Sequence, residues 1–239
     1  FLSAGIDSST VVSLMQAQSE RKVKTFTIGM QEEGYDEAKA AEQIARHLGT
    51  EHTTLYITQE DAKRVLPKLA HMFGEPFADS SQIPTYLVSS LTRQHVTVSL
   101  SGDGGDELFC GYGTYASIGQ AWERIRKIPY PLRRRLGKAL SEGALSGSEK
   151  SRIRGMLLGA GTPEELYRRS DLAEPFLGKL TAEPGKARCA FDDYPDGLLP
   201  GSYNNLMLMD LLMYHPDDIL TKVDRTAMAV SLETRIPML

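Results

Sequence analysis

The sequence predicts an α/β protein: a doubly wound parallel sheet with helices on both faces, followed by a mainly helical C-terminal half. Strand and helix signals alternate through about the first hundred residues, the pattern of a parallel sheet crossed by helices. After about residue 112 the strand signals fade while helical patterns continue. We therefore expect an α/β core over residues 1–112 and a mainly helical portion over residues 113–239 that packs on the same domain.

The first predicted elements are a helix and a strand. Residues 10–18 have helical spacing, with three apolar side chains on one face: Val11, Leu14 and Met15. The segment KVKTFTIG, residues 22–29, predicts a short, mostly buried strand that ends near Ile28. We expect an earlier strand to lie mostly upstream of Phe1 and to end at Leu2.

The second predicted helix begins at Asp36, a capping residue, and ends at Gly49, where left-handed geometry commonly closes a helix. Its inward face consists of four residues: Ala38, Ala41, Ala45 and Leu48. HTTLYI, residues 52–57, is the next strand.

One more helix with a capping signal, a further helix and a strand complete the α/β core. Thr58 and Asp61 have the spacing of a capping box at a helix start. Pro84 suits the first turn of a helix over residues 84–94. HVTVSL, residues 95–100, predicts the fourth strand.

The C-terminal half is predicted to be helical and locally basic. Residues 123–154 hold ten Arg and Lys against three Glu, a local net charge of +7. We favour a solvated helical face over an anion-binding surface, because aromatic residues are not interleaved throughout these charges as a nucleic-acid platform needs; Tyr130 stands alone. A further helical region covers residues 203–232, with Pro216 at a helix start, and residues 178–186 and 192–201 are loop-like.

Composition narrows the class of protein. The net charge of −4 gives no general attraction to nucleic acid or anionic membranes, and no run of about 18 apolar residues predicts a membrane span. Two cysteines are too few for a disulfide framework and fit a reducing, cytoplasmic compartment. The five histidines lack zinc-site spacing, so we expect no zinc.

Two loops follow strand ends, where parallel sheets bind ligands. The first loop, SAGIDSS (Ser3–Ser9), joins a strand end to a helix start and offers backbone N–H groups to an anion. The hydroxyls of Ser3, Ser8 and Ser9 add donors, whereas Asp7 is compatible with phosphate when Mg²⁺ lies between them. A Ser-rich helix cap is the alternative interpretation of this loop alone.

The second loop, SGDGGDE (Ser101–Glu107), combines glycines with three acids. Its glycines allow a ligand to approach the backbone closely. Asp103, Asp106 and Glu107 are costly together unless they are solvated or neutralised by cations. An acidic surface turn is the alternative for this loop alone, but two such loops at one sheet edge favour a shared site.

These loops resemble the synthetase domain of glutamine-hydrolysing asparagine synthetases, within the ATP pyrophosphatase (PP-loop) superfamily. The family's loop is typically SGGxDSS, matched by Ser3–Ser9, and its second signature resembles SGEGxDExFGGY, matched by SGDGGDELFCGY over residues 101–112. DDILTKVDRTAMAVSLETRIP, residues 217–237, is similar to its late helical segment. The resemblance implies an adenine nucleotide alpha hydrolase-like fold with a nucleotide-binding core over residues 1–112.

The resemblance also implies a reaction. ATP activates the aspartate side-chain carboxylate to β-aspartyl-AMP with release of pyrophosphate, and ammonia derived from glutamine then displaces AMP to give asparagine. It implies ATP and Mg²⁺ as cofactors, and a glutaminase domain of the full-length chain as partner. The oligomeric state, a homodimer included, stays open.

Roles carry over position by position. The resemblance implies catalytic roles for Asp103, Asp106 and Asp7, with Asp7 and Asp106 holding Mg²⁺. It implies ATP or pyrophosphate contacts for nine residues: Leu2, Ser3, Gly5, Asp7, Ser8, Ser9, Ile28, Ser101 and Gly102. Asp103, which stands in place of the usual Glu, would assist acyl transfer.

Two other positions depart from the family. Ala4 replaces a Gly, so we expect a negative φ there. Cys110 also replaces a Gly, and we interpret it as a small buried residue rather than a nucleophile. We expect the glutaminase domain and the family's catalytic lysine to lie outside this chain, so that these residues alone bind nucleotide but turn over poorly.

Two alternatives stay open at this stage. The adenylating chemistry could act on another carboxylate, as in related amidotransferases or β-lactam-forming relatives. The domain could also be a nucleotide-binding remnant without turnover.

Overall fold

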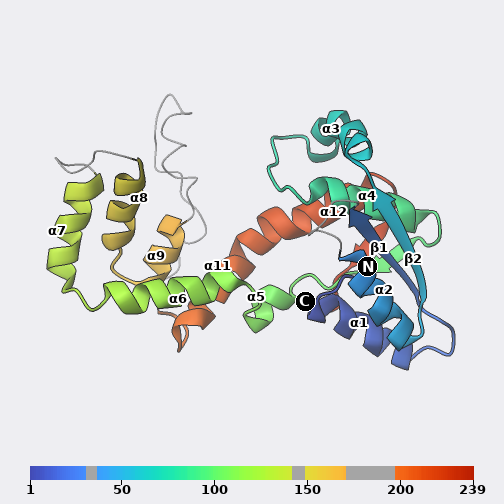
Figure 1. Ribbon diagram of the computed structural model, residues 1–239, viewed down its shortest axis with the longest axis horizontal. Coiled ribbons are helices and arrows are strands. Elements are labelled where there is room, and N and C mark those ends of the chain that lie inside the picture. Colours follow the sequence, from blue (N-terminus) through green and yellow to red (C-terminus); the bar gives the residue numbers. More distant parts are fainter. Residues whose placement is uncertain (31–36, 142–148, 171–196) are drawn as a thin grey trace. The chain divides into compact units, whose positions relative to one another are not determined.

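The computed structural model describes residues 1–30, 37–141, 149–170 and 197–239 (Figure 1). The chain divides into two compact units, which we call the α/β unit (residues 1–106 and 214–239) and the helical unit (residues 107–213). In contrast to the expected boundary at residue 112, the last 26 residues group with the N-terminal residues.

Four strands of the α/β unit form two parallel pairs. β1 (Lys24–Met30) pairs with β2 (Glu51–Ile57), and β3 (Val98–Leu100) pairs with β4 (Glu233–Arg235). The α/β class and the parallel pairing are therefore confirmed. The hydrogen bonds of these strands make two separate two-stranded sheets, so a single doubly wound sheet stays a prediction.

Backbone bonds of the first two residues reach one strand of each pair. Leu2 N–H donates to the Phe26 carbonyl at 3.0 Å, in β1. The Phe1 nitrogen donates to the Leu100 carbonyl at 2.7 Å, in β3. The start of the chain therefore lies beside both strands, and the Leu2 side chain is buried.

In the described residues of the α/β unit, six helical segments accompany these strands. They are α1 (Ile6–Ala17), α2 (Ala38–Leu48), α3 (Gln59–Phe73), α4 (Gln82–Arg93), the π-helix η2 (His215–Leu220) and α12 (Thr221–Met228).

The predicted inward face of α1 was partly wrong. The helix begins four residues earlier than residue 10, and Val11 and Val12 are buried whereas Leu14 and Met15 are exposed. Val12 packs in a core cluster with Leu2 and with two residues of α2: Ala41 and Ala45. α1 contacts its neighbours only along this narrow face. The apolar side chains one turn further along the helix, Leu14 and Met15, therefore face solvent.

Helix ends agree with the local signals. Gly49 closes α2 with φ 72°, as expected, whereas Asp36 lies outside the described residues. Thr58 and Asp61 form the predicted capping box: Asp61 N–H donates to Thr58 Oγ1 at 3.2 Å, and Thr58 N–H donates to Asp61 Oδ2 at 2.9 Å. α4 begins at Gln82, which places Pro84 in its first turn.

The helical region expected over residues 203–232 consists of three segments. α11 (Ser202–Leu212) belongs to the helical unit, and η2 and α12 follow in the α/β unit, with Pro216 in the first turn of η2. β4, which was not predicted, comes next. Its three residues are polar, and only pairing with β3 makes them a strand.

The helical unit has its own core. It contains α6 (Gly113–Ile125), α7 (Tyr130–Ser141), α8 (Glu149–Leu158), α9 (Pro163–Ser170) and α11, with short α5 (Gly105–Phe109) at the boundary of the two units. Its buried cluster has six residues: Tyr115, Ile118, Ala160, Leu166, Leu206 and Met209. In the described part of this unit no strand occurs.

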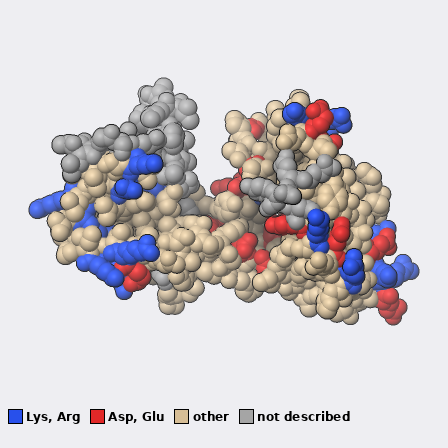
Figure 2. All heavy atoms as spheres, in the orientation of Figure 1, with Lys and Arg blue, Asp and Glu red and all other residues tan. Residues whose placement is uncertain are grey.

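The basic stretch lies on α6, α7 and α8. Arg134, Arg135 and Lys138 are exposed on α7, in keeping with a solvated face. Figure 2 shows Lys and Arg side chains over the α7–α8 region. Arg133 is the exception, because it is buried and donates to the Ala160 carbonyl.

Candidate functional site

The first loop is tied together by its own side chains. Ser3 N–H donates to Ser8 Oγ at 3.1 Å, and the two hydroxyls of these residues lie 2.9 Å apart. Ser3 Oγ accepts from Gly5 N–H at 3.0 Å, and Ser9 Oγ donates to the Gly5 carbonyl at 2.7 Å. The serines therefore fix the turn that leads into α1.

These bonds leave the start of α1 without a side-chain cap. Its N-cap residue is Gly5, with extended backbone and no capping bond from a side chain. The Ser-rich cap considered from sequence is therefore wrong, because the hydroxyls bond to the turn itself. An uncapped helix start presents N–H groups and the positive end of the helix dipole, which suits an anion.

The second loop packs directly on this helix start. A Cβ on Gly102 would lie 2.6 Å from the Ser8 nitrogen and 2.9 Å from its Cα. A Cβ on Gly105 would lie 2.6 Å from Asp7 Oδ1. Both glycines are therefore needed for close approach, and the structure brings the two loops together as the sequence predicted.

Within the second loop, Ser101 positions Asp103. Ser101 is buried, and its hydroxyl donates to Asp103 Oδ2. Ser101 N–H donates to the Arg235 carbonyl at 3.0 Å, which ties the loop to β4. The Asp103 carboxylate is therefore held by its own loop and is half-buried.

The three acids of the second loop do not form one cluster. Glu107 is buried in the helical unit, where Tyr112 OH donates to its Oε1 at 2.7 Å. The expectation that all three need solvent or cations is therefore wrong for Glu107. The Glu and Tyr of SGDGGDELFCGY are partners of each other.

Two carboxylates remain as candidate magnesium ligands. Asp7 lies against Gly105, and Asp106 follows Gly105 on α5, half-buried. Across the described ranges, no group of three or more His, Cys, Asp and Glu side chains is placed to hold a metal. A pair of carboxylates nevertheless fits Mg²⁺ shared with phosphate oxygens, since this ion is commonly bound by one or two carboxylates plus substrate phosphates.

The two predicted apolar contacts lie on different elements. Leu2 is buried at the entry to the first loop. Ile28 is half-buried in β1, two residues before the strand ends, and lies on neither loop.

The departures from the family signature have distinct outcomes. Ala4 is not among the described non-glycine residues with positive φ, as expected. Cys110 has φ 62° and is exposed, so the expectation that it is buried is wrong. A glycine at this position would adopt that φ without strain.

Sequence reasoning missed a buried charged group in the α/β unit. Lys222 Nζ lies 2.6 Å from Asp79 Oδ2, with only 10% and 12% of the two side chains exposed. Ser81 N–H and Oγ both donate to Asp79 Oδ1 at 2.6 Å. Burial alone would raise the pKa of Asp79, but the bonds from Lys222 and Ser81 outweigh it and lower that pKa.

Asp218 completes this group. Burial, followed by the nearby Asp79 carboxylate, raises its pKa. The sequence carried one signal for this group: Asp218 precedes Lys222 by four residues, and the two lie on the adjoining helices η2 and α12. The partner Asp79 lies 143 residues from Lys222, so pattern alone could not identify the pair.

A second missed group lies in the helical unit. Tyr115 OH donates to Asp210 Oδ2 at 2.6 Å, and Tyr167 OH donates to Asp210 Oδ1 at 2.7 Å. Burial raises the pKa of Asp210, although these two hydrogen bonds act to lower it. The same burial, with the bond to Asp210, raises the pKa of Tyr115.

Among the described residues, no helix is both long and apolar enough to cross a membrane.

Comparison with known proteins shows similarity along the whole chain. The family model described as asparagine synthase matches residues 1–239. "Asparagine synthetase [glutamine-hydrolyzing] 1" of Bacillus subtilis is 32% identical, over 100% of this chain and 38% of that protein. "Putative asparagine synthetase [glutamine-hydrolyzing] 2" of Methanocaldococcus jannaschii is 36% identical, over 95% of this chain and 44% of that protein.

A more distant relative matches a shorter segment. The human "Asparagine synthetase [glutamine-hydrolyzing]" is 32% identical over 46% of this chain and 21% of that protein. This chain thus spans less than half the length of each of these relatives.

Proposed function

Because this chain belongs to the asparagine synthase family, we propose that it carries out ATP-dependent formation of an amide from the side-chain carboxylate of aspartate. The observation that carries the proposal is the contact between the two loops. Gly102 and Gly105 bring the acidic loop onto an uncapped helix start that carries Asp7. Anion-binding N–H groups and carboxylates therefore meet at one place.

In the proposed reaction, a carboxylate oxygen of aspartate attacks the α-phosphorus of ATP. The bond from that phosphorus to the bridging oxygen breaks, and pyrophosphate leaves. We assign the first loop, through Ser3, Gly5, Ser8 and Ser9, to hold this leaving group. Catalysis of this kind is mainly positioning and charge neutralisation.

The chemistry of the donor set fits magnesium. We assign Asp7 and Asp106 to hold Mg²⁺, which would neutralise charge on the phosphates when bound. Leu2, Ile28 and the backbone of Ser101 and Gly102 are the proposed contacts of the AMP portion.

In the second step, the nitrogen of ammonia attacks the acyl carbon and AMP leaves. We assign Asp103 to assist this step, oriented by the Ser101 hydroxyl. As an aspartate it reaches about one methylene less than the glutamate usual in the family. We further propose that glutamine supplies the ammonia through a glutaminase domain of the same protein, in the cytoplasm.

The proposal includes one continuous sheet. Residues 1–2 donate to β1 on one side and β3 on the other, which supports the strand order β2, β1, residues 1–2, β3, β4. Both loops would then leave the carboxyl ends of adjacent central strands, where doubly wound sheets bind nucleotides.

Exchange of label between pyrophosphate and ATP tests the first step. In the protein carrying its complete native sequence, we expect exchange that requires both aspartate and Mg²⁺. Asp7→Asn and Asp106→Asn should each abolish it, whereas Glu60→Gln, which neutralises an exposed carboxylate on α3, should leave it unchanged. Exchange that is independent of aspartate, or that survives both substitutions, would contradict the proposal.

A further inference from the structure

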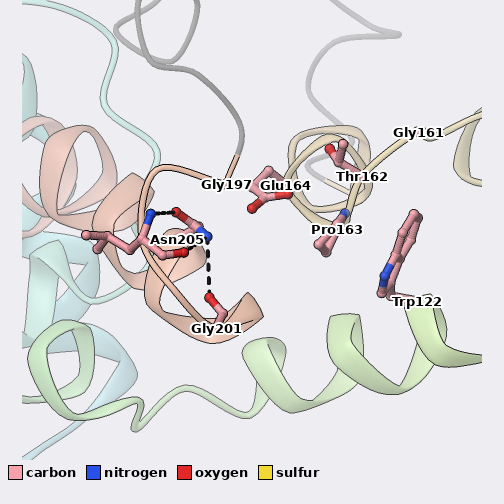
Figure 3. A pocket seen from close by; sticks show the side chains of 9 residues that line it. Trp122, Gly161, Thr162, Pro163, Glu164, Gly197, Gly201 and Asn205 are labelled. Carbon is pink, nitrogen blue, oxygen red and sulfur yellow. Dashed lines mark hydrogen bonds between the residues drawn. The ribbon is translucent and has the colours of Figure 1, made fainter.

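A pocket in the helical unit lies apart from both loops in sequence. Its volume is about 360 Å³, in the range of small-molecule sites. Figure 3 shows Trp122 of α6, Pro163 and Glu164 of α9, and Asn205 of α11 around it. The described residues that line it belong to the helical unit.

Among the described residues that line the pocket, Glu164 alone has a charged side chain. Only 4% of this residue is exposed, and no hydrogen bond or ion pair joins its side chain to any residue that the structure describes. The neighbouring Glu165 differs, since it pairs with Arg169 and accepts from Gly161 N–H. The described lining therefore carries one negative charge and no positive charge, so the pocket favours a ligand that supplies positive charge.

Trp122 supplies a surface on which a cation can rest. The indole already binds one guanidinium, since Arg133 lies 5.0 Å from its ring centroid. Arg133 is tied to the Ala160 carbonyl and does not line the pocket. An indole ring attracts a cation placed over its face, and this cation–π attraction strengthens when the cation is desolvated.

The polar rim adds no competing charge. The Asn205 side chain accepts from Leu199 N–H at 2.8 Å and donates to the carbonyls of Leu199 and Gly201 at 2.9 and 3.3 Å. Its amide thus fixes the rim, and Pro163 contributes apolar surface beside Glu164. The described lining offers one carboxylate, one indole and apolar walls.

We propose that this pocket binds an organic cation, a guanidinium or ammonium group on a short alkyl stem. The carboxylate of Glu164 pairs with the cationic head, and the stem packs on Trp122 and Pro163. The ligand is either a free small molecule or an Arg or Lys side chain of a peptide. The site uses none of the residues assigned to ATP or aspartate and stands independently of the proposed reaction.

Trp122 makes the test direct, because it is the single tryptophan of the chain. Titration with n-butylguanidinium should give a saturable change in its fluorescence. Glu164→Gln should weaken this binding by at least about 10-fold, since a hydrogen-bonded ion pair is lost. Glu123→Gln, which neutralises an exposed carboxylate next to Trp122 in sequence, should leave binding unchanged.

Neutral n-butylurea matches the shape of the probe without its charge and should not bind. A blocked peptide with one central Arg, run in parallel, distinguishes the two sources: tighter binding than n-butylguanidinium assigns the pocket to a protein side chain, and weaker binding assigns it to a free small molecule. The proposal is overturned if neither cation gives a saturable change, if n-butylurea binds as well, or if Glu164→Gln binds as tightly as the unsubstituted protein.

Discussion

Substitution of Gly102 by Ala tests whether contact between the two loops sets the geometry of the proposed site. The added Cβ would lie 2.6 Å from the Ser8 nitrogen and 3.0 Å from the Asp7 carbonyl carbon. Both are backbone atoms of α1, which cannot rotate away as a side chain would. Reaching an ordinary contact of 3.4 Å requires the loops to separate by about 0.8 Å.

This displacement falls on the N–H groups proposed to hold pyrophosphate. A misplacement of about 1 Å costs roughly 100-fold in rate where catalysis depends on positioning. We therefore expect Gly102→Ala to lower aspartate-dependent ATP–pyrophosphate exchange about 100-fold. Overpacking should also reduce the free energy of unfolding by about 1–3 kcal/mol, measured by urea denaturation.

Gly113→Ala is the matched control. Gly113 begins α6, and a Cβ there would meet nothing within 4 Å. It should leave both exchange and stability near their original values. Exchange at the unsubstituted rate in folded Gly102→Ala would refute the proposed role of the loop contact.

Three further predictions concern stability, each measured by urea denaturation. Cys110→Gly should raise the free energy of unfolding by about 1 kcal/mol, since glycine adopts φ 62° without strain; no gain would count against strain there. Tyr115→Phe should lower it by about 1.5–3 kcal/mol, because buried Asp210 loses a donor, and a neutral result would argue against that bond. Asp218 has a raised folded pKa, so its stabilising contribution is present below its unfolded pKa of about 4 and is lost as pH rises through the folded pKa. Asp218→Asn should therefore stabilise the protein at pH 7 but not at pH 3, and an equal effect at both pH values would contradict this reasoning.

The features that sequence predicted are those whose cause lies within a few residues. Gly49 ends α2 because left-handed backbone suits glycine, and Thr58 with Asp61 caps α3 across three positions. The approach of the two loops was also expected from sequence, and Gly102 permits it because it has no side chain to prevent contact.

The features that sequence missed depend on distant partners. Leu14 and Met15 have helical spacing with Val11, but α2 covers a different face of α1. β4 is a strand because β3 pairs with it. In the sequence, Glu107 cannot be distinguished from the other carboxylates of the second loop. Its hydrogen bond with Tyr112 shows that the motif SGDGGDELFCGY also contains a structural pair.

The most direct test of the central claim follows an oxygen atom. The protein carrying its complete native sequence is incubated with ATP, Mg²⁺, ammonia and aspartate labelled with ¹⁸O in its side-chain carboxylate. The AMP that forms is then analysed by mass spectrometry. Attack of the carboxylate on the α-phosphorus predicts one ¹⁸O atom in AMP. Unlabelled AMP, or ¹⁸O found in inorganic phosphate with ADP as product, would contradict it.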